Sequence, residues 1–211
     1  MRHRRSSLTA LGCALAIGLY AVAPTAARWQ EPPLSPLRLG SSRISIAGTS
    51  NVHAYTASTT AARIVRLQVA PGALGANVWE EILEPGAIEA FEIAIPATTL
   101  SSPREGVDKN MHKALKVAEH PDITFRLSRL DRAGSAGALR GTGVLTIAGV
   151  EREVTLDLKT QGDQSTFTVK GEVQLLMTDF GITPPKAMLG MLKTDPKVTV
   201  TFETVLVAPL T

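Results

Sequence analysis

The sequence contains very little cysteine: a single residue, Cys13, among 211. One cysteine cannot form an internal disulfide, and Cys13 lies in an N-terminal segment that we expect to be removed on export. The mature chain is therefore predicted to have neither a disulfide nor thiol chemistry. The roughly 180 residues that remain are enough to bury a stable core without covalent cross-links.

A net charge of either sign is also absent once the N-terminus is set aside. Residues 1–27 contain three Arg and no Asp or Glu, so removing them leaves 19 of the 22 Lys and Arg, against 19 Asp and Glu. A mature chain with no formal net charge gives no reason to expect nucleic acid or an anionic membrane surface as a partner.

Recognisable catalytic motifs are missing as well. The sequence has no Gly-x-Ser-x-Gly elbow, no His-Glu-x-x-His, no phosphate-binding loop and no cysteine pair. Outside the expected leader the histidines are His53, His112 and His120, and the last two are eight residues apart, not the four of a two-ligand helix. We therefore expect no catalytic residue, cofactor or metal, and keep a metal carrier or enzyme based on two converging histidines as a third hypothesis.

The N-terminus has the three-part layout of a secretory signal. Residues 2–5 are basic, residues 8–22 form an uncharged apolar stretch, and small residues lead up to Ala27. We predict cleavage after Ala27 and a periplasmic or secreted bacterial protein. The apolar stretch is shorter than the roughly 18–20 residues that span a membrane, so we expect no stable anchor. An uncleaved anchor and a twin-arginine signal at Arg4-Arg5 are the alternatives.

One domain is predicted after the leader. Residues 28–37 contain Pro32, Pro33 and Pro36, which indicates an extended linker. No second linker and no internal repeat follows, so residues 38–209 are expected to form a single domain.

Alternation of apolar and polar residues dominates that domain. In the clearest run, Val154, Leu156 and Leu158 alternate with polar neighbours, which is typical of a strand with one buried face. Gly149 and Gly162-Asp163 predict tight hairpin turns. Similar runs lie at residues 123–128, 167–175 and 198–203, and weaker runs lie at 43–48, 63–69, 88–95 and 141–147.

Eight such strands predict an all-β, antiparallel domain. A closed barrel is favoured because closure leaves no unpaired strand edge, and at about eight strands its interior is either filled or holds one small ligand. A sandwich is the alternative.

Helix signals are scarce. Asp108 is expected to cap a short helix that carries Met111, Leu115 and Ala118 on one face. Pro121 is expected to end it before the next strand. A second short turn is expected over residues 186–192.

A polar segment, residues 48–53, follows the first predicted strand. One interpretation is a turn in which Ser50 and Asn51 bond the local backbone, which the chemistry alone favours. The other is a polar cluster at the mouth of the barrel, including His53, that binds the head group of a ligand. The aromatic Tyr55 nearby has the same two interpretations, core or cavity entrance.

Four segments taken together resemble the YceI-like family. They are GTSNVH at 48–53, Met111 to Phe125 with HPDITF, GVLTIAGV at 143–150, and MTDFGI at 177–182 with the strand at 198–202. The segments follow the family's order and cover residues 37–207. Each is weak alone, and their combination is specific.

The resemblance implies an extended eight-stranded lipocalin-like barrel, usually exported to the bacterial periplasm, that in some members holds a polyisoprenoid or another long-chain amphiphile. The family is not known for a catalytic site. Ala54 and Tyr55 stand where an acidic residue and Trp often follow the histidine, which removes a polar partner for His53. Asp195-Pro196 stands in place of a common Gly-Asp turn, so one hairpin should differ.

The leading hypothesis is therefore an exported protein that binds a long-chain apolar or amphiphilic molecule, such as a polyisoprenoid-like lipid, inside the barrel. The second hypothesis is a barrel filled with side chains that acts in envelope stress or through a protein partner, and a homodimer stays open. Nine residues are candidates for the site: Ser50, Asn51, His53 and Tyr55 for the head group, and Trp79, Met111, Phe125, Met177 and Phe180 for the wall.

Overall fold

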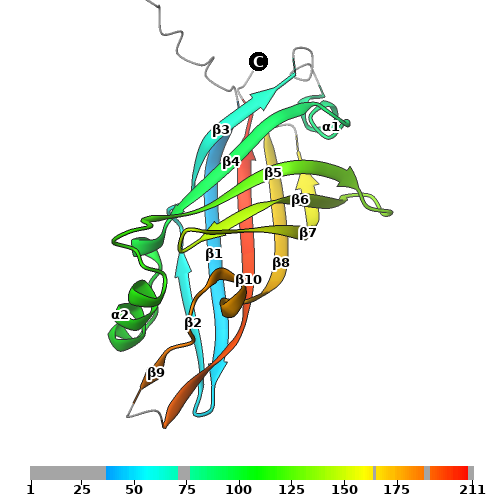
Figure 1. The fold of residues 1–211 in the computed structure, drawn as a ribbon. Helices are drawn as coiled ribbons and strands as arrows, with labels where there is room; N and C mark the ends of the chain where they lie inside the picture. Colours follow the sequence, from blue (N-terminus) through cyan, green and yellow to red (C-terminus); the bar gives the residue numbers. More distant parts are fainter. Residues whose placement is uncertain (1–36, 71–76, 164, 188–190, 209–211) are drawn as a thin grey trace, which may run out of the picture. The chain divides into compact units, whose positions relative to one another are not determined.

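The computed structural model describes residues 37–70, 77–163, 165–187 and 191–208. The expected leader (1–27) and all but the last residue of the expected linker (28–37) lie outside the described residues, so both stay predictions. The described part consists mainly of strands in one curled antiparallel sheet (Figure 1).

Alternating side chains explain why these residues form strands. In β7 (Val150–Gly162), every second residue from Val154 to Leu158 is half-buried and the polar residues between them are exposed. All eight predicted strand segments are strands. They are β1 (Arg38–Ser50), β3 (Arg63–Val69), β4 (Ile88–Pro96), β5 (Asp122–Arg132), β6 (Ala138–Ile147), β7, β8 (Thr166–Leu176) and β10 (Leu192–Val207).

Two strands were not predicted from the sequence. β2 (Ala54–Thr59) pairs with β1, and its inward positions are Tyr55, Ala57 and Thr59, which give too weak an apolar alternation to recognise. The short β9 (Lys186–Ala187) pairs with the start of β10. Of the turn predicted over residues 186–192, residues 186, 187 and 192 are therefore extended, Met191 lies in a turn, and residues 188–190 lie outside the described residues.

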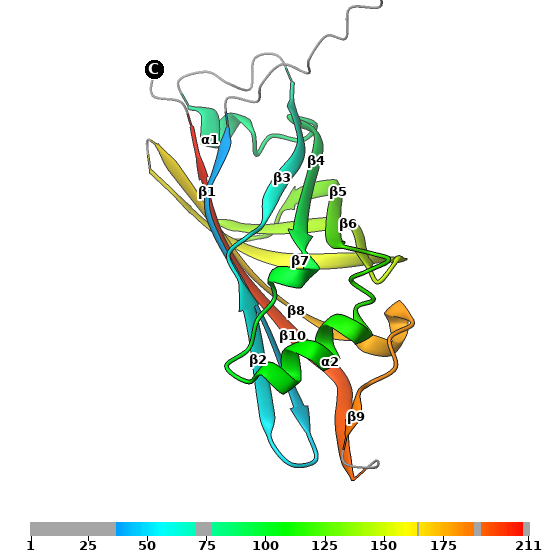
Figure 2. The same cartoon turned by 90° about the vertical axis from the view of Figure 1, so that its left-hand side faces the viewer.

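The sheet does not close into the eight-stranded barrel that we predicted. Its strand order is β2-β1-β10-β8-β7-β6-β5-β4-β3, with β9 attached to β10. The end strands β2 and β3 form no ladder with each other in the described residues, because β2 follows β1 while β3 turns away to pair with β4. β2 instead makes an isolated bridge from Ser58 to Ser101. The result is a curled, open sheet of nine strands along one path (Figures 1 and 2).

Both predicted hairpin turns are present. Between β6 and β7, Ala148 (φ 50°) and Gly149 (φ 79°) lie in the left-handed region that a two-residue primed turn requires. Between β7 and β8, Asp163 Oδ1 accepts hydrogen bonds from the backbone N–H groups of Ser165 (2.8 Å) and Thr166 (2.7 Å). These bonds lower the pKa of the Asp163 carboxyl from 3.8 to about 2.

Helices lie at the two ends of the sheet (Figures 1 and 2). The helix α2 (Glu105–Ala114) begins earlier than predicted. Asp108 is therefore inside it rather than at its cap, and its Oδ1 accepts a hydrogen bond from the Ser102 N–H (2.7 Å). Three short elements were not predicted: the four-residue α1 (Val78–Glu81) at the opposite end of the sheet, and two 3₁₀ turns, Ala97–Thr99 and Met177–Phe180.

The buried side chains form two clusters. The cluster beside α1 contains Trp79, whose ring stacks on Phe167 with ring centroids 5.2 Å apart. The cluster nearer α2 contains Leu100, Ile123 and Phe180, with Met111 packed against it. Two cavities lie along the inner face of the sheet: one borders residues of both clusters, and the other borders the cluster nearer α2.

Candidate ligand-binding site

The larger part of the inner face of the sheet surrounds an apolar cavity, which we call the apolar chamber. It has a volume of about 240 Å³, and of the thirty described residues that line it only Thr204 is polar. The side chains come from the inward positions of nearly every strand, including Val154, Leu156 and Leu158 of β7. Because alternate side chains of a strand point to the same face, the apolar residues of the period-two pattern form this wall.

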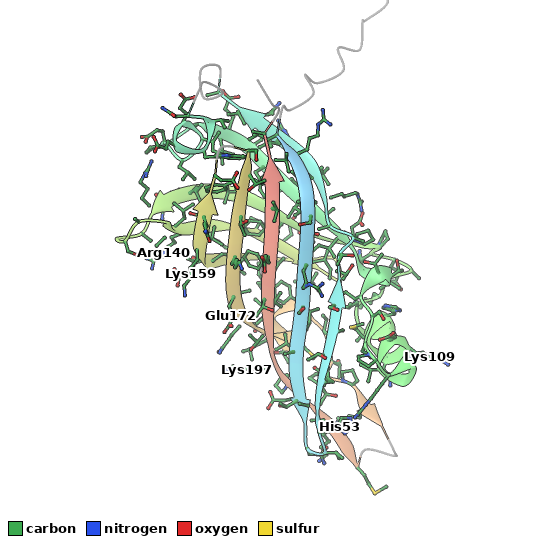
Figure 3. All side chains as sticks on the ribbon, turned by 180° about the vertical axis from the view of Figure 1, so that it is seen from behind. His53, Lys109, Arg140, Lys159, Glu172 and Lys197 are labelled. Carbon is green, nitrogen blue, oxygen red and sulfur yellow. The ribbon has the colours of Figure 1, made fainter. Side chains whose placement is uncertain are left out.

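The outer face of the same strands is polar. Arg140, Lys159 and Glu172 are all exposed, and Figure 3 shows them on the outside of the sheet. The Arg140 Nε atom pairs with the Asp157 carboxylate across β6 and β7 at 3.1 Å. The charged groups of these strands thus stay in water, away from the chamber.

A second cavity, of about 450 Å³, adjoins the first, and we call it the mixed chamber. It lies toward α2, and its lining combines apolar side chains with seven polar or charged residues. These seven are Ser50, His53, Tyr55, Arg104, Asn110, Lys186 and Thr194.

Five apolar residues line both chambers, and we call them the ring: Ile46, Ile123, Ile147, Leu175 and Val200. They come from five different strands, and Ile46 and Val200 are direct cross-strand partners between β1 and β10. Because both cavities contact the same five side chains, the ring is the boundary between them.

One face of α2 completes the mixed chamber. Arg104, Val107, Met111 and Ala114 recur every three or four residues and all line it. On the same helix, His112 Nε2 lies 2.9 Å from the Leu100 carbonyl oxygen, a hydrogen bond that fixes α2 to the segment before it.

Tyr55 contributes a hydroxyl that has no partner. Its ring packs over Gly48, its cross-strand partner in β1, where any Cβ would overlap the ring. The hydroxyl oxygen is buried and makes no hydrogen bond with a described residue. Burial, and then the charge of Asp195, raise the pKa of Tyr55, so the group is a neutral donor at ordinary pH.

The structure distributes the nine predicted site residues over several places. Ser50, His53, Tyr55, Met111, Met177 and Phe180 line the mixed chamber, and Phe125 lines the apolar chamber. Trp79 and Asn51 line neither. A role of any of the nine in binding stays a prediction.

The polar segment at 48–53 is partly the turn that the chemistry favoured. The Ser50 hydroxyl donates to the His53 carbonyl oxygen (2.9 Å) and accepts from the His53 N–H (3.1 Å). The Asn51 side chain donates to the Met191 carbonyl (2.8 Å) and accepts from the Lys193 N–H (2.8 Å), which joins the β1–β2 turn to the start of β10. Asn51 is thus occupied structurally, whereas His53 also borders the mixed chamber.

Two charged lining residues were not predicted, Arg104 and Lys186. Arg104 immediately precedes α2 and Lys186 lies in β9, and neither falls in a motif or a periodic run. Only the fold brings them to one cavity.

The three histidines have different surroundings. His53 borders the mixed chamber, His112 is bonded to Leu100, and the His120 ring lies against Gly149. No group of three or more His, Cys, Asp or Glu side chains in the described part of the chain is placed to hold a metal ion. Within the described ranges there is also no helix long and apolar enough to cross a membrane.

Comparison with known proteins identifies the family. The model of the YceI-like domain matches residues 42–206, which is the sheet from β1 to β10. The chain belongs to the YceI-like family. A search of curated proteins found no match.

Solved structures share the YceI-like fold at low sequence identity. BcnA of Burkholderia cenocepacia is 17% identical, with a TM-score of 0.60, over 78% of this chain and 95% of that one. A polyisoprenoid-binding domain of Saccharophagus degradans, implicated in plant cell wall breakdown, is 13% identical, with a TM-score of 0.59, over 82% and 99%. The YceI protein of Campylobacter jejuni is 15% identical, with a TM-score of 0.53, over 71% and 82%.

Proposed function

We propose that this YceI-like protein binds a long-chain apolar or amphiphilic molecule, such as a polyisoprenoid-like lipid, across its two adjoining chambers. The observation that carries the proposal is a nearly all-apolar cavity that shares a ring of five side chains with a second, partly polar one. An apolar chamber with one polar group among thirty lining residues suits a hydrocarbon chain. The similarity in fold to the polyisoprenoid-binding domain of Saccharophagus degradans supports the same ligand class.

Burial of the chain supplies the binding free energy. Each methylene removed from water contributes roughly 0.8 kcal/mol, so about a dozen can give micromolar or tighter binding after the cost of association. The mixed chamber alone, at about 450 Å³, lies within the range of roughly 300–1,000 Å³ that small-molecule pockets occupy.

The filled-barrel alternative predicts an interior without space. Two cavities of about 240 and 450 Å³ count against it, because native cores have few voids larger than a water molecule. We therefore propose that the protein is a carrier or binding protein, and we assign it no chemical step. Export through the predicted leader, and a periplasmic or secreted location, belong to the same proposal.

Native mass spectrometry tests the proposal. Delipidated protein mixed with polyprenyl or fatty-amide ligands should show a one-to-one complex. Val173→Phe, which places a larger side chain in the lining of the apolar chamber, should lose most of that complex. The matched control is Val65→Phe, the same change at a side chain that is 54% exposed and lines neither chamber. Absence of a complex with the unaltered protein, or equal loss in both variants, would contradict the proposal.

A further inference from the structure

The lining of the mixed chamber carries charge of one sign. Among the described residues that line it, Arg104 and Lys186 are the charged ones, and none is Asp or Glu. Neither cation pairs with a carboxylate of the described side chains. The two come from separate segments, Arg104 from the position before α2 and Lys186 from β9, and both line the mixed chamber. Figures 1 and 2 show α2 and β9 on the same half of the sheet, away from α1.

Tyr55 adds a hydrogen-bond donor to the same lining. A buried hydroxyl without a partner costs free energy, which a ligand oxygen in the chamber would recover. The geometry keeps this donor in place, because the phenol ring packs over Gly48. A tryptophan at this position would offer no hydroxyl.

The negative charge that acts on Tyr55, that of Asp195, does not belong to the lining of the mixed chamber. Asp195 acts on Tyr55 electrostatically, but it is exposed and lies outside the lining of the chamber. Its Oδ1 already accepts a hydrogen bond from the Lys197 N–H at 2.8 Å.

We propose, on the basis of the proposed function, that the mixed chamber selects amphiphiles with an anionic oxygen head, a carboxylate or a phosphate monoester. The Tyr55 hydroxyl donates to a head-group oxygen, and Arg104 and Lys186 supply the balancing positive charge. The hydrocarbon chain of such a ligand passes the ring toward the apolar chamber.

Twelve-carbon probes with different heads test the selection. Dodecanoate and dodecyl phosphate, below their micelle concentrations, should bind the full chain about tenfold more tightly than dodecylammonium. The ratio of dodecanoate to dodecyl phosphate affinity separates a carboxylate from a phosphate ligand. Equal affinity for anionic and cationic heads would overturn this inference alone. Failure of every probe to bind would overturn the proposed function and this inference with it.

Three variants locate the effect. Tyr55→Phe keeps the ring over Gly48 and should weaken dodecanoate about tenfold, with little effect on dodecylammonium. Arg104→Gln combined with Lys186→Gln should do the same. The control Lys109→Gln removes an exposed cation of α2 outside the lining (Figure 3) and should change neither. Parallel loss of both ligands in the first two variants would contradict the assignment.

Tyrosine absorbance gives a second measurement, the pKa of Tyr55, which a purely structural role of this residue would leave unchanged on ligand binding. The difference in phenolate absorbance between the unaltered chain and Tyr55→Phe isolates the titration of Tyr55. Bound dodecanoate should raise the pKa of Tyr55 further, since an adjacent anion disfavours the phenolate. An unchanged or lowered pKa in the complex would overturn the proposed contact.

Discussion

The apolar chamber has one polar residue among thirty that line it, whereas seven of the 23 residues lining the mixed chamber are polar or charged. The difference follows from where the side chains originate. Alternation within regular strands builds the apolar wall, while the polar groups of the mixed chamber come mostly from turns, short strands and the helix α2. Under the proposed function, we therefore expect most of the inner face to contact the hydrocarbon chain and only the end with the mixed chamber to distinguish head groups.

The largest effect that we expect is a loss of stability when a buried side chain of the apolar chamber is shortened. Leu100→Ala, at a side chain that is 1% exposed and borders the apolar chamber, should lower the free energy of unfolding by about 2–5 kcal/mol. The same change at Leu176, which is 43% exposed and borders the mixed chamber, should cost less than about 1 kcal/mol. Urea unfolding measures both losses, and equal losses would contradict the expected difference between the buried and the exposed leucine.

A second test acts on the ring between the chambers. Val200→Phe enlarges a ring residue, so it should weaken a ligand of about sixteen carbons by roughly 30-fold, because the chain no longer reaches the apolar chamber. A ligand of about six carbons fits the mixed chamber alone and should change by less than about threefold. Leu175→Phe provides an independent ring variant, and Val65→Phe is the surface control. If long and short ligands weaken equally in both ring variants, the ring does not divide the site.

Two glycine–aromatic pairs allow a matched comparison of the chambers. Gly48 lies under Tyr55 of the mixed chamber, and Gly171 lies under Phe202 of the apolar chamber, each as a direct cross-strand pair. An alanine at either glycine would overlap the ring, so each substitution should destabilise the fold by about 1–3 kcal/mol. Gly48→Ala alone should also reduce the preference for dodecanoate over dodecylammonium. If Gly171→Ala also lost the preference for dodecanoate over dodecylammonium, the mixed chamber would not be the site that selects the head group.

The smallest effect concerns the β7–β8 turn, which borders neither chamber. The Asp163 carboxyl, with its pKa lowered from 3.8 to about 2 by hydrogen bonds, stabilises the fold above about pH 4. This contribution is lost as the pH falls through about 2. The stability difference between the unaltered protein and Asp163→Asn should therefore shrink over that interval, as measured by thermal unfolding, while ligand affinity at neutral pH stays the same. A constant difference from pH 5 to 2 would contradict the role of the carboxylate.

Prediction from the sequence was strongest where periodicity is strong. The alternation in β7 predicted a strand, its inward face and thus part of the apolar wall. The alternation in β2 rests on Tyr55, Ala57 and Thr59, side chains too small or polar to signal burial, so this strand was missed. Without β2, the open ends of the sheet could not be inferred, and closure of eight strands was the wrong expectation.

The polar end of the site was harder to predict for a different reason. Arg104 and Lys186 are 82 positions apart in the sequence. Arg104 immediately precedes α2 and Lys186 lies in the two-residue β9, so neither belongs to a periodic pattern. Asn51 belongs to the segment that resembles the family, yet its side chain joins two backbone segments instead of lining a cavity. The family resemblance predicted a barrel-like antiparallel sheet and left open whether its interior is hollow. The two cavities and the boundary between them depend on three-dimensional packing.

The most direct test of the central claim is the affinity of unbranched alkyl carboxylates as a function of chain length, measured by calorimetry. If a chain occupies both chambers, each added methylene should tighten binding by about fourfold, until the apolar chamber is full and the affinity reaches a plateau. Affinity that does not change with chain length, or no binding at any length, would contradict the claim that the joined chambers hold a hydrocarbon chain.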